Sequence, residues 1–268
     1  MAGDISVIVP TFRRPALVVE AVRSALGQGD CVLEVLVVDD AAEPATRDAV
    51  LAIGDPRVSY HPRAVGSGGR PVLVRHEALP LAKGAFVCFL DDDDLIAPGG
   101  FQRLLEELAA HPTAAMAFGR IEPFGAGGAA LAHEVAWFLD AAHRARRAQW
   151  SGRMFLVATL LFDGSLFVTS AALFRRERLA GLGLPTLETD GIWSIDLAAR
   201  AARIGACRFV DQIVVRFRCD PGSKNPALQA PDRLRRSYAE MHRRYRERHG
   251  LGELTGLKIF ARTLKRWL

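Results

Sequence analysis

The sequence predicts an α/β fold in which a mostly parallel central sheet is flanked by helices. Strand-like and helix-like segments alternate at short intervals through the first hundred residues, as they do in parallel sheets covered by helices on both faces. Residues 85–90 are apolar without interruption, which is typical of a strand buried on both faces. With 50% hydrophobic and 24% charged residues, the 268-residue chain has the composition of a soluble globular protein.

Local patterns predict the elements of the first 110 residues. Ile5 to Val9 is a mainly β-branched run that Pro10 ends, so a strand is expected. Apolar residues then recur at helical spacing between Pro15 and Gly27, residue types favoured at a helix start and just after a helix end. The same reasoning predicts strands over residues 32–38, 58–61 and 85–90, and helices over residues 43–53, 72–81 and 98–110.

The pattern is weaker beyond residue 112. No linker and no internal repeat interrupts the chain, so we expect one continuous domain over residues 1–225, with halves of about 1–110 and 111–225, and a helical extension over residues 226–268. The second half shows strands over 116–119 and 207–215, helices opening at 174–177 and spanning 191–204, loops over 125–130 and 184–188, a basic stretch over 143–153 and an apolar stretch over 161–173.

Cysteine usage and hydropathy bound the setting of the protein. The four cysteines are scattered without a CxxC pair, which favours buried free thiols in a reducing compartment and suggests no zinc site. Met1 to Asp4 lack the basic region of a signal peptide. The longest apolar runs fall short of the roughly 20 residues that a membrane span needs. We therefore expect a cytoplasmic protein.

Positive charge is concentrated at the C-terminus. Residues 232–268 hold eleven Lys or Arg and four Asp or Glu, whereas the rest of the chain is slightly acidic. Apolar side chains recur there at helical spacing. Such a basic amphipathic extension either packs on the domain, which we favour, or makes peripheral contact with the anionic inner face of a membrane. Because the basicity is local and no matching motif is present, we expect no nucleic-acid partner.

Four consecutive carboxylates, Asp91 to Asp94, directly follow the apolar strand. Ligands of open α/β sheets bind at the carboxyl ends of the strands. Adjacent negative charges repel one another unless positive charge is near, and carboxylates suit Mg²⁺ or Mn²⁺, which is usually held together with substrate phosphates. We therefore expect a divalent metal that holds a phosphorylated ligand. The alternative is a solvated acidic turn that caps the next helix.

A second acidic pair, Asp39 and Asp40, ends the strand over residues 32–38. In a doubly wound sheet both acidic clusters share one edge, so this pair could bind a base or ribose, or cap the following helix. Arg75 lies on the helix that leads to the four aspartates, and could pair with them, bind the ligand or face solvent. The glycines of residues 65–70 match no phosphate-binding motif and favour a surface loop.

Two later segments could act on an acceptor and on a leaving group. Glu188 and Asp190 precede a helix, where a carboxylate is either a cap or a general base that takes a proton from a nucleophile. Arg216 and Arg218 follow a strand and precede a polar loop that contains Ser223. Basic residues on such a loop suit a departing diphosphate, whose charge needs stabilising.

Four motifs, taken in order, resemble those of family 2 glycosyltransferases with the GT-A fold. The resemblance covers about residues 4–220, and implies a nucleotide-sugar half followed by an acceptor half. The motifs are Val7-Ile8-Val9-Pro10-Thr11-Phe12, Val37-Val38-Asp39-Asp40-Ala41, Phe89-Leu90-Asp91-Asp92-Asp93-Asp94 and Glu188-Thr189-Asp190.

The resemblance implies roles for single residues. Asp93 and Asp91 would hold Mn²⁺ or Mg²⁺ as the two acids of the DxD motif, with Asp91 nearer the ribose. Asp190 would be the base that deprotonates the acceptor hydroxyl, with Glu188 as its rival, and the sugar would be transferred with inversion. The residues implied in nucleotide binding are Pro10, Thr11, Arg13, Asp39, Asp40, Arg75, Asp91 and Asp92.

The implied function is transfer of a sugar from a nucleotide diphosphate, with UDP favoured, to a hydroxyl of a glycan, a lipid-linked sugar or a natural product. Two positions depart from the family pattern: His76 replaces the usual Asn after Arg75, and Glu188 and Asp190 are spaced one residue wider than the common acidic pair. The alternatives are a nucleotidyltransferase, which would usually carry a basic glycine-rich loop near the first strand, and a non-catalytic sugar-nucleotide binding protein.

Overall fold

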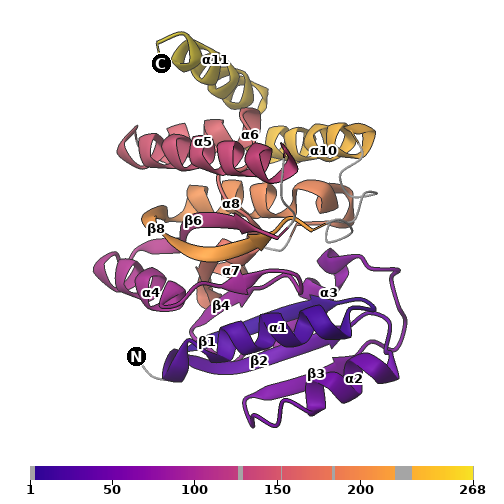
Figure 1. Cartoon of the computed structure of the whole chain (residues 1–268). Coiled ribbons are helices and arrows are strands. Elements are labelled where there is room, and N and C mark those ends of the chain that lie inside the picture. Colours follow the sequence, from indigo (N-terminus) through magenta and orange to yellow (C-terminus); the bar gives the residue numbers. More distant parts are fainter. Residues whose placement is uncertain (1–3, 126–128, 152, 183–184, 221–230, 268) are drawn as a thin grey trace.

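The computed structural model describes residues 4–125, 129–151, 153–182, 185–220 and 231–267. Its core is a mixed sheet flanked by helices, with the strand order β3-β2-β1-β4-β7-β6-β8-β5 (Figure 1). The strands are β1 (Ile5–Thr11), β2 (Val32–Asp39), β3 (Val58–Pro62), β4 (Phe86–Phe89), β5 (Leu95–Ile96), β6 (Ala114–Phe124), β7 (Ala172–Arg175) and β8 (Ala206–Arg218).

The first four strands form the parallel part of the sheet that the sequence predicts. β1 lies between β2 and β4 and is parallel to both, and β3 is parallel to β2. Every residue of β1 and of β4 is buried, which explains why their sequences lack polar alternation. The strands and helices predicted up to residue 110 are confirmed, with bounds that differ by a few residues.

Helices cover both faces of this parallel part. α1 (Pro15–Leu26) and α2 (Pro44–Leu51) contact each other and pack on β1, β2 and β3. α3 (Pro71–Ala78) belongs to the connection that runs from β3 back across the sheet to β4, so a right-handed crossover places it on the opposite face. The chain therefore changes direction between β1 and β4, which is the position at which open α/β sheets bind ligands.

The second half makes the sheet mixed. β7 is antiparallel to both of its neighbours, β4 and β6, while β6 and β8 are parallel to each other. β6 and β8 are longer than the strands predicted over residues 116–119 and 207–215. The helices of this half are α4 (Gly100–Ala110), α5 (Ala129–Ser151), α6 (Arg153–Phe162), α7 (Arg176–Leu182) and α8 (Trp193–Ile204), and the short 3-10 helix η4 (Leu187–Ile192) precedes α8.

Helix α5 corrects two predictions. Its first two residues, 129 and 130, fall in the predicted loop over 125–130. Its last turns, residues 143–151, belong to the stretch over 143–153 that was noted only for its basic charge. Alanine is the strongest helix former, and α5 buries alanines together with Phe138. Because alanine is only weakly apolar, these positions do not stand out from the arginines between them as an apolar stripe.

The C-terminal extension is helical, as predicted, and packs on the domain. α10 (Pro231–His249) lies against η4, where Ser237 Oγ donates to the backbone carbonyl of Glu188 at 2.9 Å. α11 (Leu251–Trp267) contacts α6 and α10, with Leu257 buried, and lies at the top of Figure 1. Within the residues that the structure describes, no helix is long and apolar enough to cross a membrane.

Candidate active site

The carboxyl ends of β1, β2 and β4 bring the two acidic segments to one edge of the sheet. Thr11, the last residue of β1, lies opposite Asp39, the last residue of β2. On its other side, the Thr11 hydroxyl donates to the Asp92 carboxylate at 2.8 Å. Thr11 and Asp92 are both buried. The shared edge that the sequence predicts is therefore present, and Thr11 touches the segment that follows β4.

Two arginines form ion pairs with the first three carboxylates of this acidic segment. Arg14, at the start of α1, reaches both Asp92 and Asp93 at 3.1 Å. Arg75, on α3, forms an ion pair with Asp91. The side chain of Arg75 is 5% exposed, so the alternative that it faces solvent is wrong. Asp92 and Asp94 are buried too, which rules out a merely solvated acidic turn.

The acidic segment retains excess negative charge despite these arginines. Burial, and then the charges of Asp92 and Asp91, raise the pKa of Asp93 from its usual 3.8 to about 7. Burial likewise raises the pKa of Asp92, even though Arg14 opposes the shift. A further cation at Asp91 and Asp93 would remove this repulsion.

Two carboxylates can hold a divalent metal when the substrate provides phosphate oxygens. In the described part of the chain, no cluster of three His, Cys, Asp or Glu side chains is placed to chelate an ion. Mg²⁺ does not need such a cage, because it commonly retains waters and is bound through one or two carboxylates plus substrate phosphates. Asp91 and Asp93, with hard oxygen donors and the raised pKa of Asp93, fit that arrangement.

Asp94 has a structural role behind this cluster. Ser170 Oγ lies 2.6 Å from Asp94 Oδ2, and the backbone N–H of Arg218 donates to Asp94 Oδ1 at 3.3 Å. Burial, and then the charges of Asp93 and Asp91, raise the pKa of Asp94 well above its usual value. This raised pKa favours the neutral form of the Asp94 carboxyl group, in which it would act as a hydrogen-bonding group without charge.

The neutral state of Asp94 can be tested with a pair of variants. Asp94→Asn keeps a neutral donor and acceptor, so its free energy of unfolding in urea at pH 7 should stay within about 1 kcal/mol of the wild type. Asp94→Ala leaves Ser170 and the Arg218 amide without their partner and should cost about 2–3 kcal/mol. Equal losses in the two variants would show that the charge of Asp94 is required.

Arg218 contacts the acidic segment from the side of β8. Its Nε donates to the Asp93 carbonyl at 3.0 Å, and its guanidinium also pairs with Glu20 at 2.6 Å. Arg216 is directed elsewhere, because it pairs with Glu122 at 3.1 Å on the neighbouring strand β6. The structure therefore brings Arg218, but not Arg216, to the acids. Ser223, the third residue predicted for the diphosphate, lies outside the described residues.

Asp39 and Asp40 are engaged by protein groups. Asp39 accepts hydrogen bonds from the backbone N–H groups of Ala41 and Glu43, both at 2.9 Å, and from the Tyr60 hydroxyl at 2.8 Å. Asp39 therefore stabilises the turn that leads into α2, as expected if this residue caps the following helix. The carboxylate lies at the same edge as Thr11 and is fully buried among these protein donors.

Asp40 organises the glycine-rich loop. It forms an ion pair with Arg63 and accepts from the backbone N–H groups of Ser67 at 2.8 Å and Gly69 at 2.6 Å. Burial alone would raise the pKa of Asp40, but these hydrogen bonds outweigh it and lower the pKa below 3.8. Gly66 is required for close approach, since a Cβ there would lie 2.6 Å from the Asp40 carbonyl oxygen.

Pro10 and Arg13, near the end of β1, have different surroundings. Pro10 is buried inside β1, opposite Val38. Arg13 is exposed just after the strand, has a positive φ of 56°, and stacks on the Phe12 ring at 5.1 Å. Arg14, which the sequence reasoning did not single out, is the arginine that reaches the acids.

Segment η4 contacts both α3 and α10. The backbone of Asp190 belongs to η4, and its side chain lies outside the described residues. The Glu188 side chain is 60% exposed and pairs with Arg244 of α10 at 3.2 Å. His76, the departure from the family pattern, donates from Nε2 to the Pro185 carbonyl at 2.5 Å and so holds the start of this segment against α3.

Trp193, which directly follows η4 and begins α8, packs against the end of β4. Its ring packs edge-on against Phe89 of β4 at 5.0 Å, and the Arg75 guanidinium lies over it at 4.7 Å. Two buried donors here, Arg75 Nε and Trp193 Nε1, have no acceptor among the described protein groups. No local pattern marked Trp193 or Ser170, because both join the site only through the antiparallel half of the fold.

The family of the chain follows from comparison with known proteins. Residues 6–180 match the glycosyl transferase family 2, so the chain belongs to that family. It is 35% identical over 109 residues to the succinoglycan biosynthesis protein ExoO of Rhizobium meliloti, which covers 40% of this chain and 30% of ExoO. It is 33% identical over 93 residues to the UDP-Glc:alpha-D-GlcNAc-diphosphoundecaprenol beta-1,3-glucosyltransferase WfgD of Escherichia coli, covering 34% and 35% of the two chains.

Solved structures confirm the GT-A fold. The mannosyltransferase PcManGT from Pyrobaculum calidifontis, in complex with GDP-Man and Mn²⁺, matches 98% of this chain and 81% of its own with a TM-score of 0.61 and 20% identity. Staphylococcus aureus TarS 1–349 in complex with UDP-GlcNAc matches 82% and 59% of the two chains with a TM-score of 0.60 and 18% identity. The matched segment spans about a third of the length of the two curated relatives.

Proposed function

We propose that this protein is a metal-dependent, inverting glycosyltransferase that moves a sugar from a UDP-linked donor to an acceptor hydroxyl. The observation that carries the proposal is the placement of Asp91 and Asp93, with a raised pKa at Asp93, at the carboxyl end of β4 between Arg14 and Arg75. The family match favours transfer of a sugar over the nucleotidyltransferase alternative.

Asp91 and Asp93 are the residues that would hold Mn²⁺ or Mg²⁺. The metal, when bound, supplies positive charge that stabilises the negative charge of the leaving diphosphate. Arg75 and Arg14 keep the two carboxylates oriented, and the hydrogen bond from Thr11 holds the segment between them. The mannosyltransferase that shares this fold was solved with Mn²⁺, which supports the choice of a divalent metal.

Asp190 is proposed as the general base. It would take the proton from the acceptor hydroxyl while the oxygen attacks the anomeric carbon and the bond to the diphosphate breaks on the opposite face, which inverts the sugar. The position of η4 supports this role, since His76 and Trp193 hold the two ends of the segment against the nucleotide half. Glu188 is the weaker candidate, because it is exposed and paired with Arg244.

The donor and acceptor are proposed from the curated relatives. WfgD is named for UDP-Glc and for a diphosphoundecaprenol acceptor, which supports a UDP-sugar and, of the three acceptor classes, a lipid-linked sugar. Exposed Ile259 and Phe260 on α11, beside Lys258, support peripheral contact with the anionic membrane that would carry such an acceptor.

Calorimetric titration with UDP, GDP, CDP and dTDP, each with and without Mn²⁺, tests the proposal. We expect UDP to bind most tightly, and only when Mn²⁺ is present, because the uncompensated carboxylates repel a diphosphate. Preference for GDP, the nucleotide part of the GDP-Man in the Pyrobaculum mannosyltransferase structure, would change the donor and retain the mechanism. If UDP binds equally tightly in the presence of a chelator, the metal has no part in donor binding.

A further inference from the structure

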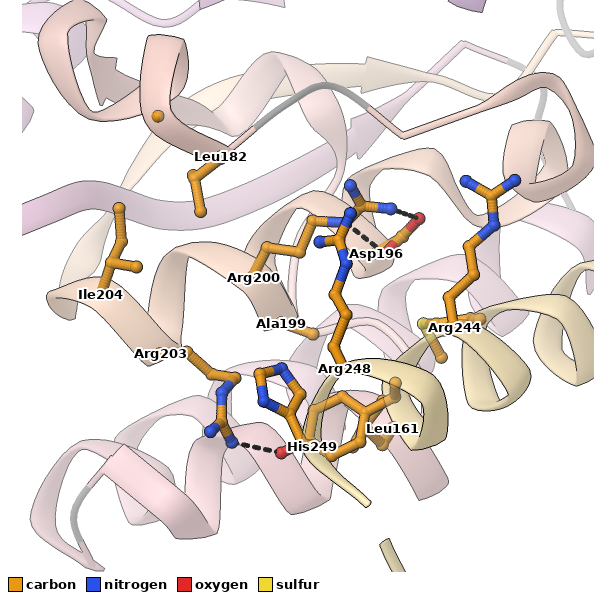
Figure 2. A pocket seen from close by; sticks show the side chains of 13 residues that line it. Leu161, Leu182, Asp196, Ala199, Arg200, Arg203, Ile204, Arg244, Arg248 and His249 are labelled. Atoms are coloured by element: carbon orange, nitrogen blue, oxygen red, sulfur yellow. Dashed lines mark hydrogen bonds and ion pairs between the residues drawn. The ribbon is translucent and has the colours of Figure 1, made fainter. Parts of the chain in front are cut away.

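A pocket of about 260 Å³ lies between α6, α7, α8 and α10, and none of the acids at the end of β4 is among the described residues that line it. Part of its lining is apolar and includes Leu161, Leu182 and Met241. Figure 2 shows that the remaining side chains come mainly from two helices that face each other, α8 and α10. The basic members of this lining are Arg200, Arg203, Arg244, Arg248 and His249.

Acidic side chains neutralise only part of this positive charge. Among the described residues that line the pocket, Asp196 is the only carboxylate, and it is already bound by Arg200 at 2.8 and 2.9 Å and by the Thr189 hydroxyl at 3.0 Å. Asp196 is buried, so this arrangement is protected from solvent and leaves the carboxylate little capacity to neutralise a second guanidinium.

Two further arginines of the lining form ion pairs with glutamates that are not among its described residues. Arg203 forms an ion pair with Glu253. Arg244 pairs with Glu240 at 2.5 Å and with Glu188 at 3.2 Å. Both arginines remain part of the lining, and each guanidinium carries five N–H donors, more than these contacts use.

Arg248 has no such partner. Across the described residues, no hydrogen bond or ion pair reaches its guanidinium, and Figure 2 shows the side chain extending from α10 toward Arg200 and Asp196 on α8. Burial, and then the positive charge of Arg203, lower the pKa of His249 below 6.5, and Arg248 lowers it further. The side chains that meet in this pocket therefore create a positive potential.

We propose that the pocket binds the phosphate or diphosphate group of an anionic ligand. Guanidinium groups match phosphate oxygens with paired, charge-assisted hydrogen bonds, and Arg248 and Arg200 approach the same space from opposite helices. The apolar part of the lining can hold the uncharged portion of such a ligand. The phosphate could belong to a soluble ester or to a lipid headgroup.

The pocket is connected to η4 by two of the contacts above. Thr189 of η4 binds Asp196, and Glu188 of η4 binds Arg244. A phosphate in the pocket would compete with Glu188 for Arg244. Its binding would therefore weaken a contact of η4, the segment that carries Asp190. The site does not depend on the acids at the end of β4, and its test is independent of theirs.

Titration of the full chain with sodium pyrophosphate in EDTA tests the proposal, because the chelator removes metal-dependent binding at the β4 acids. The variant is Arg248→Gln, which breaks no described contact. Its matched control is Arg246→Gln, an exposed arginine two residues away on α10 that is absent from the lining. We expect saturable binding by the wild type, a loss of at least about tenfold in affinity for Arg248→Gln, and a change below about twofold for Arg246→Gln.

Sedimentation with vesicles distinguishes the two sources of phosphate. If the ligand is a lipid headgroup, the wild type and Arg246→Gln should sediment with phosphatidylglycerol vesicles to a greater extent than Arg248→Gln. Phosphatidylcholine vesicles, which carry no net charge, serve as the control. Weaker vesicle binding by Arg248→Gln, in the absence of pyrophosphate binding, would assign the pocket to a lipid headgroup. Pyrophosphate binding that depends on Arg248, with equal vesicle binding by the two variants, would assign the pocket to a soluble phosphate. If the two variants behave alike in both assays, the arginines act only as surface charge and the proposal is wrong.

Discussion

Replacement of Asp190 by Asn is expected to lower sugar transfer by about 10²–10⁴-fold, the factor that general base catalysis typically supplies. The substitution removes a proton acceptor and leaves Asp91, Asp93 and Arg75 unchanged, so Mn²⁺-dependent nucleotide binding should stay within about twofold of the wild type. Turnover of donor in the presence of acceptor and calorimetry with the nucleotide measure the two quantities separately.

Glu188→Gln is the matched control for this experiment. It makes the same change of a carboxylate to an amide two residues away, at a side chain that is 60% exposed and paired with Arg244. We expect it to retain activity within about threefold of the wild type, since exposed ion pairs contribute little. Loss of transfer in Glu188→Gln with full activity in Asp190→Asn would reassign the base to Glu188.

Asp93→Asn is expected to weaken Mn²⁺-dependent nucleotide binding by more than about 100-fold. Loss of outer groups around a metal already costs 10–100-fold, and here a proposed ligand itself is lost. Calorimetric titration of UDP with Mn²⁺ measures the effect. Unchanged affinity would remove Asp93 from the metal site.

The same substitution should stabilise the metal-free protein. The pKa of Asp93 is about 7 in the fold, against 3.8 for an ordinary aspartate, so the folded protein holds a proton that the unfolded chain releases over this range. Stability is therefore lost as the pH rises from about 4 to 7, and Asn avoids that loss. In EDTA at pH 8 the variant should exceed the wild type in free energy of unfolding by roughly 1–3 kcal/mol, and the difference should vanish near pH 4. A difference independent of pH would contradict the raised pKa.

The parallel half of the fold could be predicted because each of its elements has a complete local signal. The apolar run over residues 85–90, for example, is continuous because both faces of β4 are buried. Helix α5 could not be predicted in this way, since its buried face consists mostly of alanines, which have high helix propensity but little hydrophobicity. The apolar stretch over residues 161–173 indicated no single element, and only its ends belong to α6 and β7, with the 3-10 helix η3 (Thr169–Ala171) between them.

Residues of the candidate site that directly follow strand ends could be predicted from the sequence. Residues that other elements bring to the site could not. Asp91 to Asp94 could be found because ligands meet α/β sheets at this edge. Between Arg13 and Arg14, which are adjacent, nothing local indicates which one turns toward the acids. The distinction between Arg216 and Arg218 is of the same kind, because the two residues are two positions apart in β8 and strand alternation places both on one face.

The sequence by itself determined the α/β class, the family and the order of the acidic segments, because buried strands and the polar residues at their ends leave continuous patterns in the chain. Only the tertiary structure decided which charges meet. It paired Arg75 with Asp91 and Arg14 with Asp93, and it assembled a basic pocket from α8 and α10. These contacts join residues far apart in the chain, and their geometry depends on how whole helices pack on the sheet, which no local pattern encodes.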